Sequence, residues 1–449
     1  MENIVIIGAG LVGSLLSIYL AKAGYQVTIY ERNSDPRLRE RHSNIGQSVN
    51  ITLCERGFQS LKDVGIDEIV RRHTIPLYNR AIHTSNNGSI FQPYGNKGEA
   101  LYTIRRETLI NLLLDRVRSQ ENIQIYFDQR CLDVNLQTAE LTLESLETGK
   151  TYKVCSDRII AADGAYSNVR SVMQKQKRFN YSQEYNQQGY REIIIPAGTN
   201  GEWQLPKNAL HIWPRDNFLL LGFPNLDGTF TLSLHLPFEG VVSHEAIDSP
   251  QKLAELFTSN FPDVWSLIAT NYGSYFDRSP QTMVTVKCFP WTYGDKVALI
   301  GDACHAIFPY YGQGTNAGFE DCRILMQCLE RHRGNWQKIF QEYETIRKLD
   351  MDIIADLCCQ HLDTLSEKLN NSQFLLRQKI ERLLQKFCPD YFSLYHNISF
   401  TSMSYSQAVS LESKYQSLIE QLTTSIKTQL SESELEQQLR KKLEHFQIV

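Results

Sequence analysis

The 449-residue sequence lacks several features that mark whole classes of protein. It contains no run of the roughly 20 apolar residues that a membrane-spanning helix requires. Its ten cysteines show no C-x-x-C spacing, and Cys358 and Cys359 are adjacent, so neither a zinc site nor a disulfide framework is indicated. No basic stripe with interleaved aromatic residues occurs, and the net charge of -4 gives no strong attraction for a polyanion. Nucleic acid is therefore not an expected partner.

Targeting signals and anchors are also missing from the pattern. An apolar strand is expected from Ile4, with no basic segment or small-residue cleavage site before it, so no signal peptide is expected. The C-terminal part is strongly polar, so no terminal membrane anchor is expected. The hydrophobic content of 42% is sufficient for two or three folded domains. We therefore expect a cytoplasmic protein that binds a small molecule and is a monomer or a homodimer.

The order of apolar runs and turn residues predicts an α/β protein. The apolar run Ile4–Ile7 is followed by glycines, by helical periodicity and by a second apolar run, Val27–Tyr30, which together predict a βαβ unit of a parallel sheet. Between residues 210 and 236, apolar and polar residues alternate as in an antiparallel sheet. From about residue 341 onward the pattern is helical, with one long polar helix expected at roughly 405 to 445.

Nucleotide-binding signals on both sides of the strand-rich stretch indicate that two domains are interleaved. We predict a Rossmann-like nucleotide-binding domain, an antiparallel-sheet substrate domain inserted into it, and a helical C-terminal region. The first comprises residues 1–75, 102–175 and 280–345, the second residues 76–101 and 176–279, and the third residues 346–449.

A glycine-rich segment carries the first of these signals. Gly8-Ala9-Gly10-Leu11-Val12-Gly13 matches G-x-G-x-x-G and lies between a predicted strand and a predicted helix. The first glycine permits the tight turn, the second lets a pyrophosphate approach the backbone, and the third allows the helix to pack closely on the strand. About twenty residues further on, Glu31 is placed to accept hydrogen bonds from a ribose. The predicted cofactor contacts here are Gly8, Gly10, Leu11, Val12, Gly13, Glu31 and Arg32.

Two further segments distinguish FAD from NAD as the cofactor. Asp163-Gly164 and Gly301-Asp302 each follow an apolar strand and resemble the D-G and G-D motifs of flavin hydroxylases, where the second aspartate holds the ribityl chain of FAD. Gly301 lets the backbone turn against the cofactor, and Asp302 offers a carboxylate to its hydroxyl groups.

A third region is expected to contact the flavin ring and the pyrophosphate. A helix is predicted whose first turn contains Gly314, Thr315 and Asn316. The backbone amides of this turn and the positive end of the helix dipole are expected to lie beside the flavin pyrimidine ring. Arg106 begins another helix and resembles the arginine that this family places near the pyrophosphate. A surface salt bridge is the alternative role for Arg106.

Taken together, these motifs resemble the class A FAD-dependent aromatic hydroxylases, and among them most closely the kynurenine 3-monooxygenases. The resemblance is carried most specifically by Leu210-His211-Ile212-Trp213-Pro214-Arg215 and by Gly318-Phe319-Glu320-Asp321-Cys322, and less specifically by Gly46–Asn50, Pro93–Gly95 and Tyr181–Gln183. It implies FAD as bound cofactor, with NADPH and O2 as co-substrates.

The resemblance further implies that NADPH reduces the flavin and that a flavin C4a-hydroperoxide hydroxylates the ring of kynurenine to give 3-hydroxykynurenine. No catalytic side chain is assigned, because the aniline nitrogen activates its own ring. Two alternatives stay open. One is the same chemistry on another aromatic amino acid, such as tryptophan or a derivative. The other is a non-catalytic binding protein built on an FAD fold, against which the intact D-G and G-D motifs stand.

The resemblance implies that the substrate carboxylate is held by an arginine and a tyrosine of the substrate domain and by an asparagine and a second tyrosine of the C-terminal helices. This chain has Arg80, Tyr94 and Tyr395 at the arginine and tyrosine positions. A guanidinium suits a bidentate carboxylate contact; the alternative is that Arg80 lies on a strand surface and the tyrosines belong to the core. Departures from the family pattern are Gln47 for arginine, Tyr310 and Tyr311 for two phenylalanines, Thr315 for methionine and His361 for asparagine. The predicted substrate contacts are Arg80, Tyr94, Tyr311, Thr315, His361 and Tyr395.

Overall fold

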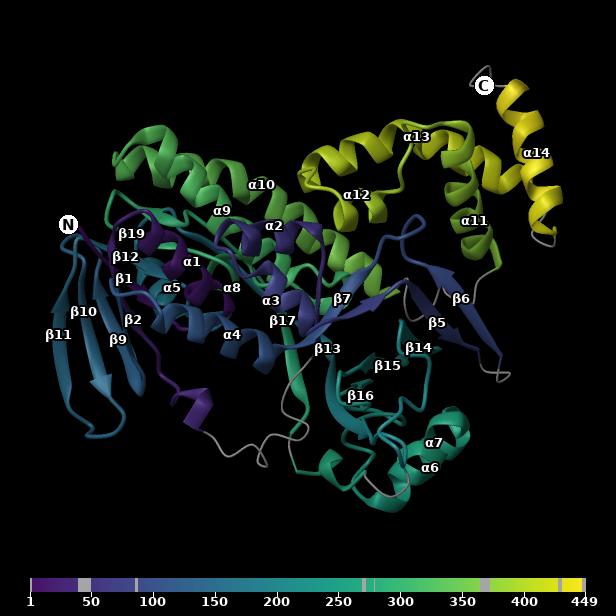
Figure 1. Cartoon of the computed structure of the whole chain (residues 1–449), viewed down its shortest axis with the longest axis horizontal. Coiled ribbons are helices and arrows are strands. Elements are labelled where there is room, and N and C mark those ends of the chain that lie inside the picture. Colours follow the sequence, from purple (N-terminus) through teal and green to yellow (C-terminus); the bar gives the residue numbers. More distant parts are fainter. Residues whose placement is uncertain are drawn as a thin grey trace.

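The computed structural model describes residues 2–38, 50–84, 88–268, 272–277, 279–363, 372–426 and 430–445. Within these residues the chain forms a parallel sheet, an antiparallel sheet, two small sheets and a group of C-terminal helices (Figure 1). The prediction for Gly46 and Gln47 falls outside the described residues.

The parallel sheet carries the predicted nucleotide-binding motifs at the carboxyl ends of its strands. β1 pairs in parallel with β2 and β12, β12 with β19, and β2 with β8, whereas β18 is an antiparallel edge strand. Ile4, Val5 and Ile6 are fully buried, as strands covered on both faces require. In spatial order the strands are β18 (Thr292–Tyr293), β19 (Val297–Leu299), β12 (Arg158–Ala161), β1 (Asn3–Ile7), β2 (Gln26–Tyr30) and β8 (Ile123–Tyr126).

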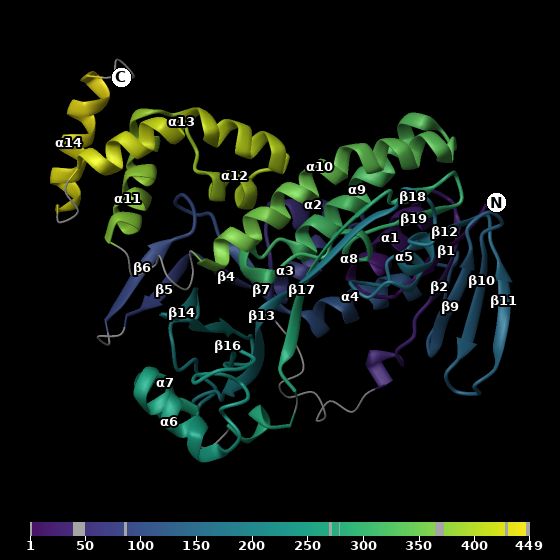
Figure 2. The ribbon, with the colours of Figure 1, turned by 180° about the vertical axis from the view of Figure 1, so that it is seen from behind.

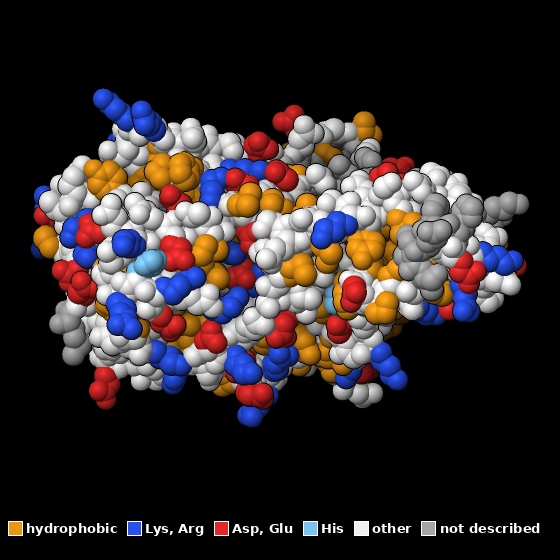
Figure 3. Space-filling model, turned by 90° about the horizontal axis from the view of Figure 1, so that it is seen from above, with side chains coloured by type: hydrophobic (Ala, Val, Ile, Leu, Met, Phe, Trp, Pro, Cys, Tyr) orange, Lys and Arg blue, Asp and Glu red, His pale blue; other side chains and the backbone are white. Residues whose placement is uncertain are grey.

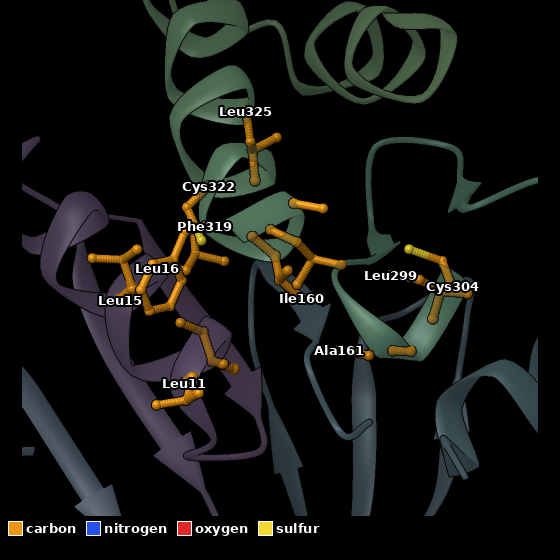
Figure 4. Close-up of a cluster of buried hydrophobic side chains, with 14 of the residues drawn as sticks. Leu11, Leu15, Leu16, Ile160, Ala161, Leu299, Cys304, Phe319, Cys322 and Leu325 are labelled. Atoms are coloured by element: carbon orange, nitrogen blue, oxygen red, sulfur yellow. The ribbon is translucent and has the colours of Figure 1, made fainter. Parts of the chain in front are cut away.

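Helices α1 (Leu11–Lys22) and α9 (Gly314–His332) pack against each other beside this sheet, and α1 also contacts α4 (Arg106–Arg118). Figure 4 shows how side chains of these two helices lie beside those of β12 and β19. The labelled side chains of α1 and α9 are Leu11, Leu15, Leu16, Phe319, Cys322 and Leu325. This packing fixes the N-termini of both helices, which are the parts that face the cavity described below.

The predicted antiparallel sheet has seven strands and includes one parallel pair, β5 with β14. Its strands in spatial order are β17 (Gln281–Phe289), β13 (Asn180–Ile195), β16 (Phe230–Pro237), β15 (Phe218–Pro224), β14 (Ala209–Arg215), β5 (Asn79–His83) and β6 (Ser89–Pro93). Helices α6 (Pro250–Asn260) and α7 (Pro262–Ile268) lie against it, and their apolar side chains share a core with the sheet. β17 belongs to this sheet, although the sequence prediction placed residues from 280 onward in the nucleotide-binding domain.

Two small three-stranded sheets complete the strand structure. One consists of β3 (Asn50–Leu53), β7 (Leu101–Arg105) and β4 (Ile75–Leu77). The short helices α2 (Glu55–Asp63) and α3 (Asp67–Arg72) lie between β3 and β4 in the chain. The other consists of β11 (Thr151–Cys155), β10 (Glu140–Ser145) and β9 (Gln129–Asn135). The sequence prediction named no strand in this second sheet.

The C-terminal part is helical, as predicted, but its last helix is broken in two. In order along the chain, the helices are α10 (Trp336–Asp363), α11 (Ser372–Phe387), α12 (Leu394–Phe400), α13 (Tyr405–Ser425) and α14 (Glu432–His445). The single helix expected at 405 to 445 is therefore wrong. α11, α13 and α14 share a separate apolar cluster around Ile380, Leu422 and Leu439. Figure 2 shows these helices at the end of the molecule opposite the N-terminus.

On the face seen in Figure 3, acidic and basic side chains are interspersed rather than gathered by sign. None of the helices in the described part of the chain has the length and apolar character of a membrane span.

Candidate active site

A cavity of about 430 Å³ lies where the parallel sheet, the antiparallel sheet and the start of α12 meet. Its volume falls in the range of sites that bind small molecules and cofactors. One part of its wall is formed by the turns that follow β1 and β12 and by the start of α9. The other part is formed by side chains of β5, β14, β15, β16 and β13 and by Tyr395 of α12.

The three glycines after β1 have different surroundings. Gly8 has φ of 101°, and a Cβ atom there would lie 2.5 Å from the Ala162 carbonyl oxygen; at Gly13 it would lie 2.0 Å from the Gly8 carbonyl oxygen. At Gly10 a Cβ atom would meet nothing within 4 Å. Gly8 and Gly13 are therefore required for packing, whereas Gly10 faces open space in the cavity wall.

The N-terminus of α1 fits a bound pyrophosphate. Leu11 and Val12 line the cavity with Gly10, and no side chain caps this helix end. Uncapped amides and the positive end of a helix dipole form an anion site. Arg106, at the start of α4, also lines the cavity and adds a cation.

Glu31 and Arg32 lie outside the cavity lining. The Glu31 carboxylate accepts hydrogen bonds from the backbone amides of Ala9 and Asn33, each at 2.8 Å. Glu31 therefore holds the backbone of the glycine turn through the Ala9 amide. Arg32 is exposed at the surface. A ribose contact by either residue stays a prediction.

The two motif aspartates have different roles in the structure. The Asp163 carboxylate accepts a 2.8 Å hydrogen bond from the Asn168 amide and so caps α5 (Asn168–Met173), leaving Gly164 in the cavity wall. Asp302, at the start of α8 (Asp302–His305), lines the cavity directly. The Asp302 side chain is exposed to the cavity, and the surrounding protein raises the pKa of its carboxyl by desolvation, although His305 and Arg106 act in the opposite direction.

A buried ion network holds the Gly301-Asp302 turn. Asp321 Oδ2 accepts hydrogen bonds from the Gly301 amide at 3.2 Å and from His305 Nε2 at 2.6 Å, while its Oδ1 pairs with Arg347 Nε at 2.6 Å. Gly301 itself has φ of 62°. Burial alone would raise the pKa of Asp321, but the charges of His305 and Arg347 outweigh it and keep the pKa below its ordinary value. Asp321 therefore positions the turn that presents Asp302.

The start of α9 supplies a second uncapped helix N-terminus, and Gly314 and Thr315 both line the cavity. Asn316 is fully buried away from it. Its amide nitrogen donates to the carbonyls of Thr52 and Gly312, and its oxygen accepts from the Cys54 amide. The hydrogen bonds of Asn316 thus join α9 to β3 and are directed to the chain itself.

Arg80, Tyr94 and Tyr395 come together at one end of the cavity although they belong to β5, the loop after β6 and α12. The guanidinium carbon of Arg80 lies 4.5 Å from the centre of the Tyr94 ring and 4.3 Å from that of Tyr395. Arg80 is 9% exposed; its guanidinium is hydrogen-bonded to Tyr395 and Tyr94, and no carboxylate among the described residues is near enough to act on it. Such a cation is placed to receive an anion.

Tyr311 extends this end of the cavity, since its ring stacks on that of Tyr395 at 5.3 Å. His361 lies in the last turn of α10, but its side chain is outside the described part of the structure. A second, smaller cavity of about 140 Å³ reaches Arg80, Tyr94 and Tyr395 from the side of α11.

Several lining residues of the cavity were not identified from the sequence. They are Tyr190, Glu192, Thr231, Ser233, His235 and Tyr310. Thr231, Ser233 and His235 occupy alternate positions of the otherwise apolar strand β16, so they share one face of the sheet. This period-two pattern of polar residues was the signal that could have revealed them.

Comparison with known proteins agrees with this geometry. The family model described as FAD binding domain matches residues 1–200 and 268–350, which is more than half of the chain. The chain is 41% identical over 441 residues to a kynurenine 3-monooxygenase from Flavobacterium psychrophilum, covering 98% of each chain. It is 42% identical over 410 residues to a kynurenine 3-monooxygenase from Flavobacterium johnsoniae, covering 91% of each.

Solved structures share the fold at lower sequence identity. A variant of 2-methyl-3-hydroxypyridine-5-carboxylic acid oxygenase superposes with a TM-score of 0.69 at 22% identity, covering 83% of this chain and 94% of that one. p-Nitrophenol 4-monooxygenase from Pseudomonas putida gives a TM-score of 0.65 at 16% identity, with 82% and 90% covered. The likeness to these two structures concerns the fold alone.

Proposed function

The chain belongs to the kynurenine 3-monooxygenase family, and from this premise we propose that it hydroxylates the aromatic ring of L-kynurenine to give 3-hydroxykynurenine. It is an FAD-dependent aromatic monooxygenase, with NADPH and O2 as co-substrates. The single observation that carries the substrate assignment is the buried cation Arg80, held between two tyrosine rings at one end of the cavity.

The residues of the cavity wall fit FAD. Gly10 leaves the space that a pyrophosphate needs, the uncapped ends of α1 and α9 offer amides, and Asp302 offers a carboxylate to the ribityl hydroxyls. When bound, FAD supplies the electrons from NADPH and the activation of O2. The protein binds, orients and encloses the reactants, and no side chain of the cavity is assigned a proton-transfer role.

The substrate would be oriented by a cationic end of the cavity and by an apolar part of its wall. An amino-acid carboxylate would pair with Arg80 and accept hydrogen bonds from the hydroxyls of Tyr94 and Tyr395. The aromatic ring would then lie against the apolar side chains of Leu210, Ile212 and Leu221, which face the cavity from β14 and β15. These apolar side chains would exclude water from the part of the cavity that holds the ring.

A second candidate is the same reaction on another aromatic amino acid, such as tryptophan. It is favoured by Tyr311 and Thr315, which depart from the family pattern and line the cavity. A non-catalytic role is disfavoured because the cavity retains the groups expected to contact FAD. Since all ten cysteines are free thiols, we further infer a reducing, cytoplasmic setting.

Product analysis tests the proposal. The holoenzyme would be incubated with L-kynurenine, NADPH and ¹⁸O2, and the product examined by mass spectrometry. One ¹⁸O atom in 3-hydroxykynurenine is the expected result. Oxidation of NADPH without a hydroxylated product, or ¹⁸O found only in a product of tryptophan, would contradict the assignment to kynurenine.

A further inference from the structure

We propose that His235 and Tyr310 form a recognition site for polar ring substituents of the substrate. The site would favour aromatic amino acids that carry an amine and a ketone on neighbouring ring positions over those that lack the amine. This inference rests on the proposed function, because it assumes that an aromatic amino acid occupies the cavity.

The two side chains lie against each other in the cavity wall. Their ring centres are 5.7 Å apart, and His235 and Tyr310 are 3% and 8% exposed. His235 Nε2 lies 3.0 Å from the Ser233 hydroxyl, whereas His235 Nδ1 and the Tyr310 hydroxyl have no hydrogen-bond partner among the described residues. Buried polar groups are nearly always hydrogen-bonded in folded proteins. The structure therefore leaves two polar groups for a ligand to satisfy.

The cavity wall around this pair is mixed, since Tyr190, Glu192 and Thr231 add polar side chains to it. His235 stacks on Tyr190 at 5.4 Å, and the adjacent strand β15 presents Leu221 and Phe223 to the cavity. A polar substituent of the substrate that reaches this wall meets His235, Tyr310 and Ser233, with Tyr190 and Glu192 on the paired strand β13. A ligand with an unsubstituted ring would leave His235 Nδ1 and the Tyr310 hydroxyl without a hydrogen-bond partner, which lowers the affinity for that ligand.

The site lies within reach of a substrate held by Arg80. Tyr311 stacks on Tyr395 at the carboxylate end of the cavity, and the preceding residue, Tyr310, contacts His235. Both contacts belong to the wall of one cavity, because all four of these residues line it. A molecule with a carboxylate at one end and a substituted ring at the other can span them.

The chemistry of the pair suits an amine beside a ketone. Burial lowers the pKa of His235 to about 3, so the imidazole is neutral and has one N–H donor and one acceptor nitrogen. The Ser233 and Tyr310 hydroxyls can each donate or accept. When Ser233 accepts from Nε2, Nδ1 can accept a hydrogen bond from a ring amine, and the Tyr310 hydroxyl can donate to a ketone oxygen.

Equilibrium binding to the oxidised holoenzyme tests the inference. L-kynurenine would be compared with 2-amino-4-oxo-4-phenylbutanoic acid, which lacks only the ring amine, by calorimetry and by the flavin absorbance change. The wild-type protein is expected to prefer kynurenine by about tenfold, the effect of one good hydrogen bond. In His235→Phe this preference is expected to fall to about twofold or less, mainly through weaker kynurenine binding. Tyr310→Phe should weaken the binding of both ketones.

His235→Asn serves as the matched variant, because it removes the imidazole but keeps a donor and an acceptor. It should retain more of the preference for kynurenine than His235→Phe, at equal FAD content. Equal binding of the two ligands by the wild-type protein, or equal losses in the Asn and Phe variants, would overturn the inference while leaving the proposed function intact. Failure of the wild-type protein to bind either ligand would instead contradict the proposed function.

Discussion

Tyr395 of α12 lies over the guanidinium of Arg80 in β5, with 4.3 Å between the guanidinium carbon and the ring centre. This contact joins the antiparallel sheet to the C-terminal helices and completes the end of the cavity where we propose that the substrate carboxylate binds. The helical C-terminal region therefore contributes to the wall of the cavity through α12.

Replacement of Arg80 by Met should raise the KM for L-kynurenine by about 100-fold, corresponding to about 3 kcal/mol, because the substrate carboxylate would lose the buried guanidinium that we propose pairs with it. FAD binding should not change, since Arg80 lies at the opposite end of the cavity from the glycine turn. Steady-state kinetics and the flavin spectrum measure both effects. Arg130→Met, on the exposed strand β9, is the control. An unchanged KM in the Arg80 variant would refute this role.

Two glycine variants should separate folding from cofactor binding. Gly8→Ala forces a Cβ atom into the Ala162 carbonyl at a positive φ, so the apoprotein should lose about 2 kcal/mol or more of stability. Gly10→Ala meets no atom in the chain and should leave the apoprotein unchanged, but its methyl group occupies cofactor space and should weaken FAD binding. Thermal melts of the apoproteins and FAD titrations measure these effects. Equal changes in apoprotein stability and in FAD affinity in the two variants would contradict the separate roles of Gly8 in folding and Gly10 in cofactor binding.

Asp321→Asn should destabilise the protein by about 3 kcal/mol, because it leaves Arg347 partly unpaired in a buried site. The sign of its pH dependence follows from the lowered pKa of Asp321. The carboxylate stabilises the fold fully above its ordinary pKa of about 3.9, and this stabilisation is lost as the pH falls through the lower folded-state value. Urea unfolding of both proteins should therefore show a difference that narrows in acid. A constant difference would argue against the ion pair.

Glu412 of α13 should make the protein less stable as the pH rises toward neutrality. Burial, followed by the Glu381 carboxylate, raises the pKa of Glu412 to about 7, although Arg377 lies 3.5 Å away. The folded protein then retains a proton that the unfolded chain loses above about pH 4.3, so the free energy of unfolding falls between these values by about 1.4 kcal/mol per pH unit. Glu412→Gln should flatten this dependence in urea unfolding from pH 5 to 8. The same dependence of the free energy of unfolding on pH in the wild-type protein and in Glu412→Gln would contradict this role of Glu412.

The sequence was most informative where a short local motif determines the geometry of the backbone. The different roles of Gly8, Gly10 and Gly13 were predicted because a pyrophosphate on a helix N-terminus dictates both the glycine spacing and the turn. The capping role of Asp163 and the inward hydrogen bonds of Asn316 were not predicted, because their partners lie across a turn or in another element.

The substrate end of the cavity was harder to predict. Arg80 and Tyr94 were identified through the family resemblance. The period-two pattern of β16 could have placed His235 on the cavity face, but its contact with Tyr310 depends on the pairing of β16 within the sheet and on the turn before α9. The break between α13 and α14 was missed because the polar pattern continues through it. Long-range pairing and loop geometry are not encoded in local periodicity.

The most direct test is anaerobic stopped-flow reduction of the enzyme-bound flavin by NADPH, with and without L-kynurenine and then with L-tryptophan. The account predicts that L-kynurenine accelerates flavin reduction strongly, that L-tryptophan does so weakly or not at all, and that Arg80→Met loses the acceleration at the same kynurenine concentration. Acceleration by L-tryptophan alone, or a reduction rate that no aromatic amino acid changes, would contradict it.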